Sequence, residues 1–173
     1  MSSNPLDKNT LRTIAHYPAA IMQQVQSLIS EDRLGDYLRG RYPDRHQLNN
    51  DSDLYSFTLG LKDRYLKRSK PLNKALYADG LDTVKNALGT HTRISRVHGG
   101  KLKSKNEIRI ASVFKNTPVD FLSMIVVHEL AHFKEHDHNK AFYQLCCHME
   151  PNYHQFELDV RLYLLLLDSG QSL

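Results

Sequence analysis

Cysteine is scarce in this 173-residue sequence, and a long apolar run is missing. The two cysteines, Cys146 and Cys147, are adjacent in the chain, and neighbouring cysteines are poorly placed for disulfide geometry. The longest uninterrupted apolar run, residues 162–167, is far too short to span a bilayer. The polar N-terminus lacks the apolar segment of a signal peptide. We therefore expect a cytoplasmic protein with reduced thiols and no membrane partner.

No internal repeat, low-complexity tract or linker interrupts the sequence either, so one domain over residues 1–173 is the simplest organisation. The sequence has a net charge of +4, and this charge is distributed unevenly along the chain. Residues 60–115 hold fourteen lysines and arginines against four acidic residues, which gives this segment +10 and the rest of the chain −6. Such a basic segment favours an anionic partner, unless it is only a solvated basic surface.

The first third of the sequence has the apolar spacing of helices. Pro18 suits the start of a helix whose apolar residues share one face, and this helix should fail before Tyr42-Pro43. A second helix is expected to begin at the cap cluster of residues 51–53 and to end in the basic residues 67–70.

The middle of the sequence changes to the pattern of strands. Residues 92–97 and 107–114 are short runs with β-branched residues and partial alternation, and a turn that contains Gly99 and Gly100 separates them. They predict a basic β-hairpin, which an earlier strand near residues 81–87 extends into a small sheet of three or more strands. Because helical patterns precede and follow this sheet, the predicted fold class is α+β.

A buried helix is expected after the hairpin. Thr117 is a natural N-cap, Pro118 suits the first helical position and Asp120 completes a pattern like a capping box. Residues 121–133 are then apolar around nearly the whole circumference, which is typical of a helix buried on all sides. Polar groups on such a helix need partners or a metal, because leaving each unpaired costs on the order of a few kcal/mol.

Three residues of that helix, His128, Glu129 and His132, form an H-E-x-x-H motif. Residues one turn apart share a helix face, so both imidazoles can reach one Zn²⁺ at about 2.0–2.1 Å. Glu129, next to the first ligand, can take a proton from the water that the metal activates. The alternative is two satisfied core histidines beside a glutamate, but the capped and buried helix argues against it. We predict one zinc ion per chain, with Glu129 as the general base.

A catalytic zinc site uses three protein ligands and leaves one position open. His138 is the preferred third ligand, because the polar residues 134–137 should end the motif helix and Asn139 can cap the next helix. The chain can then fold back onto the metal at His138. The rivals for this position are His136, Glu150 and Glu157.

Other residues give weaker signals. Tyr153, His148 and His154 are able to donate a hydrogen bond to an oxyanion, although such residues more often pack or face water. The cysteine pair is expected to pack in the core, because vicinal thiols do not match a zinc-finger spacing. Besides Tyr153, the candidate substrate contacts are basic residues of the hairpin: Arg93, Arg96, Lys101, Lys103, Lys105 and Arg109.

The motif and its surroundings resemble the YgjP-like family of small zincin-type metalloproteins. The family pattern is H-E-x-x-H, five residues, then His followed by N/S-x-x-F, and it is met here by His128, Glu129, His132, His138, Asn139 and Phe142. The resemblance covers nearly the whole chain, including the basic hairpin. Where many relatives carry a W-G-S-C element, this sequence has no tryptophan and reads Val-His-Gly-Gly at residues 97–100. The resemblance implies a zincin-like α+β fold with N-terminal helices, a small sheet, a buried motif helix and C-terminal helices, and it implies the three histidines as ligands.

Three functions follow from these observations. The favoured one is a nucleotide hydrolase that acts as a UTP pyrophosphatase, an activity described within the family, because the basic segment suits the phosphates. No Walker A loop or acidic magnesium cluster supports it. The second is a metallopeptidase, the class to which the motif assigns the family. The third is a non-catalytic zinc protein that binds nucleic acid, which Glu129 disfavours because a structural site needs no base.

Overall fold

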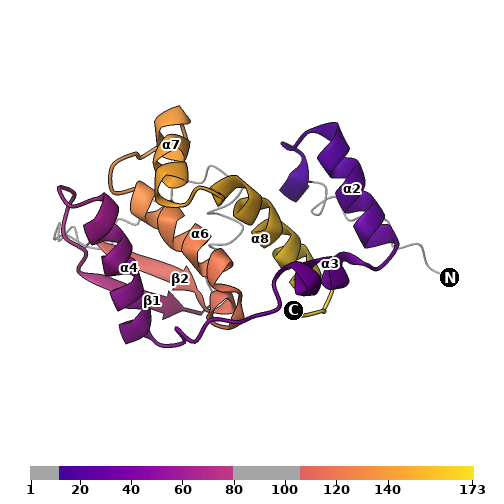
Figure 1. Ribbon diagram of the computed structural model, residues 1–173, viewed down its shortest axis with the longest axis horizontal. Coiled ribbons are helices and arrows are strands. Elements are labelled where there is room, and N and C mark those ends of the chain that lie inside the picture. Colours follow the sequence, from indigo (N-terminus) through magenta and orange to yellow (C-terminus); the bar gives the residue numbers. More distant parts are fainter. Residues whose placement is uncertain (1–11, 80–105) are drawn as a thin grey trace, which may run out of the picture.

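The structure is a computed structural model, and it describes residues 12–79 and 106–173. Helices dominate both ends of the described chain, with two short strands between them (Figure 1). This arrangement confirms the α+β class. In chain order the elements are α2 (Ala19–Ser30), α3 (Leu34–Arg41), α4 (Asp51–Tyr65), β1 (Lys74–Ala78), β2 (Glu107–Ala111), the 3₁₀ helix η1 (Ser112–Asn116), α6 (Val119–Ala131), α7 (Lys140–Met149) and α8 (Tyr153–Asp168).

The prediction of one continuous N-terminal helix is wrong, because the structure divides this segment into α2 and α3. Asp32 between them has a φ of 54°, a left-handed conformation that aspartate tolerates better than most residues. The backbone N–H of Arg33 donates to the carbonyl of Leu28 at 2.8 Å, which closes the end of α2 as a Schellman motif does. The second predicted helix is confirmed as α4, although it ends at Tyr65, before the basic residues 67–70 in which its end was predicted. Its N-cap is Asn50, whose side chain accepts from the N–H of Asp53 at 2.9 Å.

The described sheet consists of β1 and β2, which are parallel. Ala75 pairs with Ile108 and Tyr77 with Ile110, and these four residues form the buried face of the strands. The predicted strand over 107–114 is correct only for β2, because the chain then enters η1. The other predicted strands, near 81–87 and over 92–97, and the turn between the hairpin arms lie outside the described residues.

The motif helix α6 lies at the centre of the fold. It contacts β2, α4, α7 and α8, and it runs beside α8 in Figure 1. Phe121, Leu122, Met124 and Val126 on this helix are completely buried, which confirms the prediction of a helix enclosed on all sides. The predicted cap at Thr117 is wrong. The Thr117 hydroxyl donates instead to the carbonyl of Phe114 at 3.0 Å, and no side chain caps α6.

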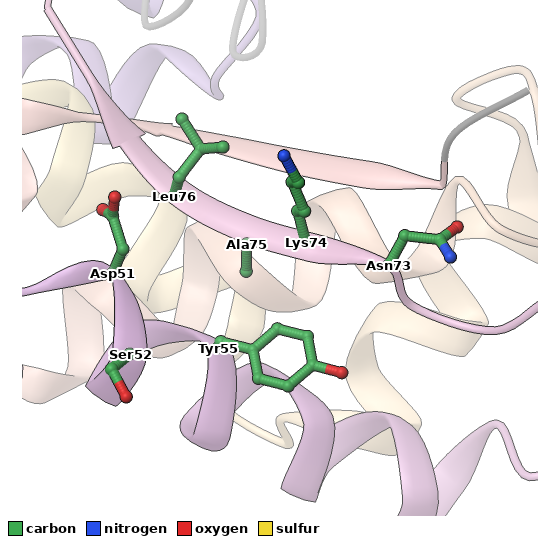
Figure 2. Close-up of a pocket in the computed structure, with 7 residues that line it drawn as sticks. All are labelled: Asp51, Ser52, Tyr55, Asn73, Lys74, Ala75 and Leu76. Atoms are coloured by element: carbon green, nitrogen blue, oxygen red, sulfur yellow. The ribbon is translucent and has the colours of Figure 1, made fainter. Parts of the chain in front are cut away.

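A shallow pocket lies between the start of α4 and the strand β1 (Figure 2). Its polar groups serve the packing of these two elements. Asp51 accepts a hydrogen bond from the backbone N–H of Tyr77 at 2.8 Å, and the Tyr55 hydroxyl donates to the carbonyl of Leu72 at 3.3 Å. Within the described ranges, no helix is long and apolar enough to cross a membrane.

Candidate metal centre

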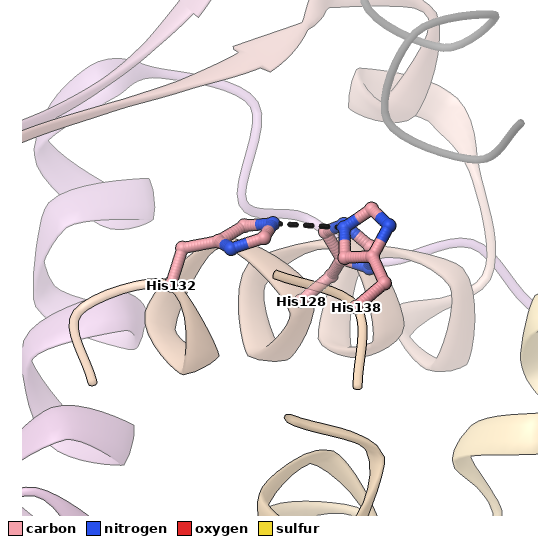
Figure 3. Close-up of side chains that lie close together, drawn as sticks. All are labelled: His128, His132 and His138. Atoms are coloured by element: carbon pink, nitrogen blue, oxygen red, sulfur yellow. Dashed lines mark hydrogen bonds between the residues drawn. The ribbon is translucent and has the colours of Figure 1, made fainter. Parts of the chain in front are cut away.

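Two elements bring three histidines together (Figure 3). His128 lies on α6, and His132 follows its last residue as the C-cap, one turn further along the same face. The chain then turns and returns with His138, directly before α7. The Asn139 side chain accepts from the N–H of Phe142 at 2.9 Å, which confirms the predicted cap and fixes where α7 begins. The ligand nitrogens of the three histidines all lie within 4.8 Å of one another.

Hydrogen bonds engage Nδ1 of both His128 and His132 with groups outside the cluster. Nδ1 of His132 donates to the carbonyl of Glu135 at 2.9 Å, which leaves its Nε2 3.0 Å from Nε2 of His138. Nδ1 of His128 lies 2.8 Å from the Tyr153 hydroxyl. Nε2 of His128 is buried and has no hydrogen-bond partner among the residues that the structure describes.

These residues fit a metal ion. A buried nitrogen without a partner is costly, and a metal ion satisfies it. Imidazole nitrogens hold zinc, for example, at about 2.0–2.1 Å, so two of them on a tetrahedral ion lie about 3.3 Å apart. The observed separation of 3.0 Å between His132 and His138 is close to this value. Three imidazoles leave one further position for water or substrate.

The electrostatic environment also suits metal binding. Burial, followed by the neighbouring rings of His132 and His138, holds the pKa of His128 well below its usual value. Burial lowers the pKa of His132 as well. Both rings therefore stay neutral, which is the form that coordinates a metal. Glu129, beside His128 on α6, is partly buried, and burial raises its pKa to about 7.

Phe142 of α7 completes the packing around the histidines. Its completely buried ring lies 4.9 Å from the ring of His128 and 4.7 Å from those of His132 and His138, measured between centroids. The side chain therefore supports all three imidazoles at once. The family pattern included a phenylalanine at this position but gave no reason for it.

The rivals for the third ligand position are occupied elsewhere or exposed. His136 is exposed. The Glu150 carboxylate accepts from the Ser123 hydroxyl at 3.3 Å and from the N–H of Asn152 at 3.2 Å. The buried Glu157 carboxylate accepts from Arg161 and from the Tyr17 hydroxyl, both at 3.3 Å. Over the described ranges, the only group of metal-binding side chains is His128, His132 and His138.

The remaining candidate residues are dispersed. His148 and His154 are exposed, and their rings lie beside Tyr65 and Tyr143 respectively. Arg109 is exposed on β2, where its Nε donates to Glu107 at 2.6 Å. Both cysteines are free; Cys146 is buried, as the predicted core packing requires, whereas Cys147 is only half-buried. Five basic candidates lie outside the described residues: Arg93, Arg96, Lys101, Lys103 and Lys105.

Sequence reasoning did not anticipate two supports of the site. The Glu135 carbonyl that holds His132 belongs to the backbone, so no residue type indicates it. Tyr153 was predicted as a substrate contact or oxyanion donor. The structure places it completely buried at the start of α8, against the Nδ1 side of His128.

A buried H-E-x-x-H helix and a third histidine, carried on an α+β fold, define the class of zincin-like hydrolases. A family model described as "YgjP-like, metallopeptidase domain" matches residues 85–161. A protein of Escherichia coli (strain K12) named "UTP pyrophosphatase" is 54% identical over 164 residues, which is 95% of this chain and 98% of the relative. No solved structure matches. The chain belongs to the YgjP-like family and is a hydrolase.

Proposed function

We propose that the protein is a zinc-dependent nucleoside triphosphate pyrophosphatase that hydrolyses UTP to UMP and pyrophosphate. The observation that carries the hydrolytic part is the gathering of three imidazoles beside Glu129. Among the described residues, nothing else satisfies Nε2 of His128. The choice of UTP is supported by the name of the Escherichia coli relative and by its 54% identity over 95% of the chain.

In this proposal His128, His132 and His138 hold the zinc ion, which when bound activates a water molecule and polarises a phosphoryl oxygen. Glu129 accepts a proton as the water oxygen bonds to the α-phosphorus of UTP. The bond from that phosphorus to the bridging oxygen then breaks, and Glu129 returns the proton to the departing pyrophosphate. A carboxyl pKa of about 7 suits a group that must both accept and return a proton near neutrality.

The charge of the chain supports an anionic substrate. Residues 60–115 carry a net +10, and lysine and arginine neutralise the charge that develops in phosphoryl transfer. Within this segment we propose Arg93, Arg96, Lys101, Lys103 and Arg109 as contacts of the triphosphate. Tyr153 is not proposed as a contact, since its hydroxyl is engaged with His128.

A peptidase is the second candidate, because the family model that matches residues 85–161 is described as a metallopeptidase domain. The same ligands and the same base would serve it, with attack on a peptide carbonyl carbon instead of phosphorus. The two candidates therefore differ in substrate and not in the site. Only an assay of products separates them.

The test is product analysis of UTP incubated with zinc-loaded protein in water enriched in ¹⁸O. We expect UMP and pyrophosphate, with the label in UMP because water attacks the α-phosphorus. Glu129→Gln should keep its zinc and lose about 10²–10⁴-fold in rate, the usual contribution of a general base. Glu31→Gln, a change at an exposed glutamate outside α6, is the matched control and should retain the rate of the wild type.

Each result has a definite meaning. Absence of UTP turnover by the zinc-loaded wild type rejects the nucleotide proposal and directs the search to peptide libraries. Turnover that Glu129→Gln does not reduce removes the glutamate from the mechanism. Label found in pyrophosphate shifts the attack to the β-phosphorus.

A further inference from the structure

Tyr153 contacts His128 on the side of the imidazole that carries Nδ1. It is the first residue of α8, its side chain is completely buried, and its hydroxyl lies 2.8 Å from Nδ1 of His128. The two rings are nearly parallel, with 17° between their planes. On the other side of the imidazole, Nε2 is buried without a hydrogen-bond partner among the described residues, and the ring centroid lies 5.1 Å from that of His132 and 4.8 Å from that of His138. Tyr153 is therefore placed to influence the ligand without touching what the ligand binds.

The direction of this hydrogen bond decides what His128 can do. A neutral imidazole carries one proton, and only the nitrogen without it has a lone pair for a metal. If the Tyr153 hydroxyl donates to Nδ1, the proton sits on Nε2 and blocks coordination. If Nδ1 donates to the tyrosine oxygen, Nε2 presents its lone pair to the centre of the cluster.

The surroundings of Nε2 favour the second arrangement. This nitrogen is buried and has no hydrogen-bond partner among the described residues, so a proton placed on it would be a buried donor without an acceptor. A lone pair on Nε2 is satisfied by a metal ion. The tyrosine oxygen keeps lone pairs beside its own proton, so it can accept from Nδ1 of His128.

The two ligands of the motif need different supports because of their places in the helix. His132 stands at the end of α6, where the following turn brings the carbonyl of Glu135 within 2.9 Å of its Nδ1. His128 lies inside the helix, where the nearby carbonyls are engaged in helical hydrogen bonds. An acceptor for its Nδ1 must therefore come from a side chain of another element.

We propose that Tyr153 is the positioning residue of the metal centre, which holds His128 in the tautomer and orientation that present Nε2 to the ion. This inference rests on the metal site of the proposed function and not on its substrate. Loss of such an outer partner typically weakens metal binding about 10–100-fold. A residue that only filled space would leave metal affinity unchanged.

The test compares Tyr153→Phe with Tyr163→Phe in the full chain. Tyr163 is a buried tyrosine on the same helix, and its hydroxyl donates to the Val113 carbonyl at 3.1 Å, so its substitution controls for the loss of one buried hydrogen bond. Zinc affinity is measured by competition with a chromophoric chelator. We expect about 10–100-fold weaker binding for Tyr153→Phe and a change of about twofold or less for Tyr163→Phe. The visible absorption of the Co²⁺-loaded protein should change only in Tyr153→Phe.

A measurement on the wild type serves if Tyr153→Phe does not fold. Long-range ¹H–¹⁵N NMR spectra of the metal-free protein distinguish the two tautomers of a neutral histidine. We expect His128 to carry its proton on Nδ1, the nitrogen that faces the Tyr153 hydroxyl. A proton on Nε2, or wild-type affinity in a folded Tyr153→Phe, would overturn the proposal. Wild-type protein that binds zinc but leaves UTP intact removes the proposed substrate, whereas the comparison of affinities still decides the role of Tyr153.

Discussion

Nδ1 of His132 donates a hydrogen bond to the backbone carbonyl of Glu135 across 2.9 Å. A carbonyl oxygen can only accept, so the proton of the neutral ring is fixed on Nδ1. Nε2 is left with its lone pair, 3.0 Å from Nε2 of His138. The turn that ends α6 thus orients one proposed ligand and carries the chain to the next proposed ligand. We infer that the loop between His132 and His138 is as much a part of the centre as the motif.

The first prediction concerns the third ligand. His138→Ala should lower bound zinc well below one ion per chain, because a two-histidine site is incomplete. The measurement is elemental analysis after dialysis against a weak chelator. His136→Ala is the control, since this exposed histidine lies only two residues away and outside the cluster. It should retain one zinc. Tight, stoichiometric zinc in His138→Ala would mean that another residue completes the site.

The motif residues could be predicted because local geometry determines them. A helix places His128 and His132 on one face whatever surrounds it. The apolar circumference of residues 121–133 indicates that this helix is buried. Asn139 was recognisable for a similar reason, since its side chain caps a helix within the next three residues. To predict that His138 lies beside the two motif histidines required one further inference, namely that the chain turns back after the polar residues 134–137.

The other features of the fold and of the site could not be predicted in this way, because most of them depend on contacts between segments that are distant in the sequence. β1 has only two buried residues, Ala75 and Tyr77, and its alternation is too short to stand out from the flanking loop. The helix break at Asp32 depends on one residue in the left-handed conformation, and no adjacent glycine in the sequence indicated it. Tyr153 is 25 residues from His128, so their hydrogen bond exists only once α8 packs on α6.

The second prediction concerns Phe142, whose ring packs against all three histidines. Phe142→Ala should lower the free energy of unfolding by about 3–5 kcal/mol, the usual cost of removing a buried aromatic side chain. It should also weaken zinc binding, because the imidazoles lose their common support. Urea unfolding of metal-free protein and chelator competition measure the two effects separately.

Phe142→Leu is the matched variant, because it keeps most of the apolar volume. A smaller loss of stability is expected, with zinc affinity between those of the wild type and the alanine variant. If the alanine variant unfolds more readily but binds zinc as tightly as the wild type, the ring supports the core and not the ligands.

The third prediction concerns the buried ion pair between Glu157 and Arg161 on α8. The pair also holds the N-terminal segment, because Arg161 donates to the Thr13 carbonyl at 3.2 Å and Glu157 accepts from Tyr17. Removal of one partner leaves an uncompensated buried charge. Arg161→Met alone should therefore cost about 3–5 kcal/mol in the free energy of unfolding.

The double variant with Glu157→Leu tests this explanation. Replacing a buried ion pair by apolar residues of similar volume is often nearly neutral, so the double variant should recover much of the stability lost in Arg161→Met. Urea unfolding of the two single variants and the double variant gives the coupling free energy. Simple additivity of the two single losses contradicts the prediction.

The last prediction concerns Asp159, a completely buried carboxylate that joins α8 to α3. It accepts from the Tyr37 hydroxyl at 3.2 Å, from the Tyr42 hydroxyl and from Gln155 at 3.1 Å, and Arg41 lies 3.4 Å away. Asp159→Asn removes the charge and turns an amide donor towards groups that are themselves donors. We expect a loss of about 3 kcal/mol in the free energy of unfolding, measured by urea titration.

The control for Asp159→Asn is Asp168→Asn, an exposed change at the end of the same helix. It should stay within about 0.5 kcal/mol of the wild type in the same urea titration. Since α3 depends on these contacts, limited trypsin digestion should cut after Arg39 or Arg41 sooner in Asp159→Asn. Equal stability and equal digestion in the two variants would show that the contacts of Asp159 do not hold α3 on α8.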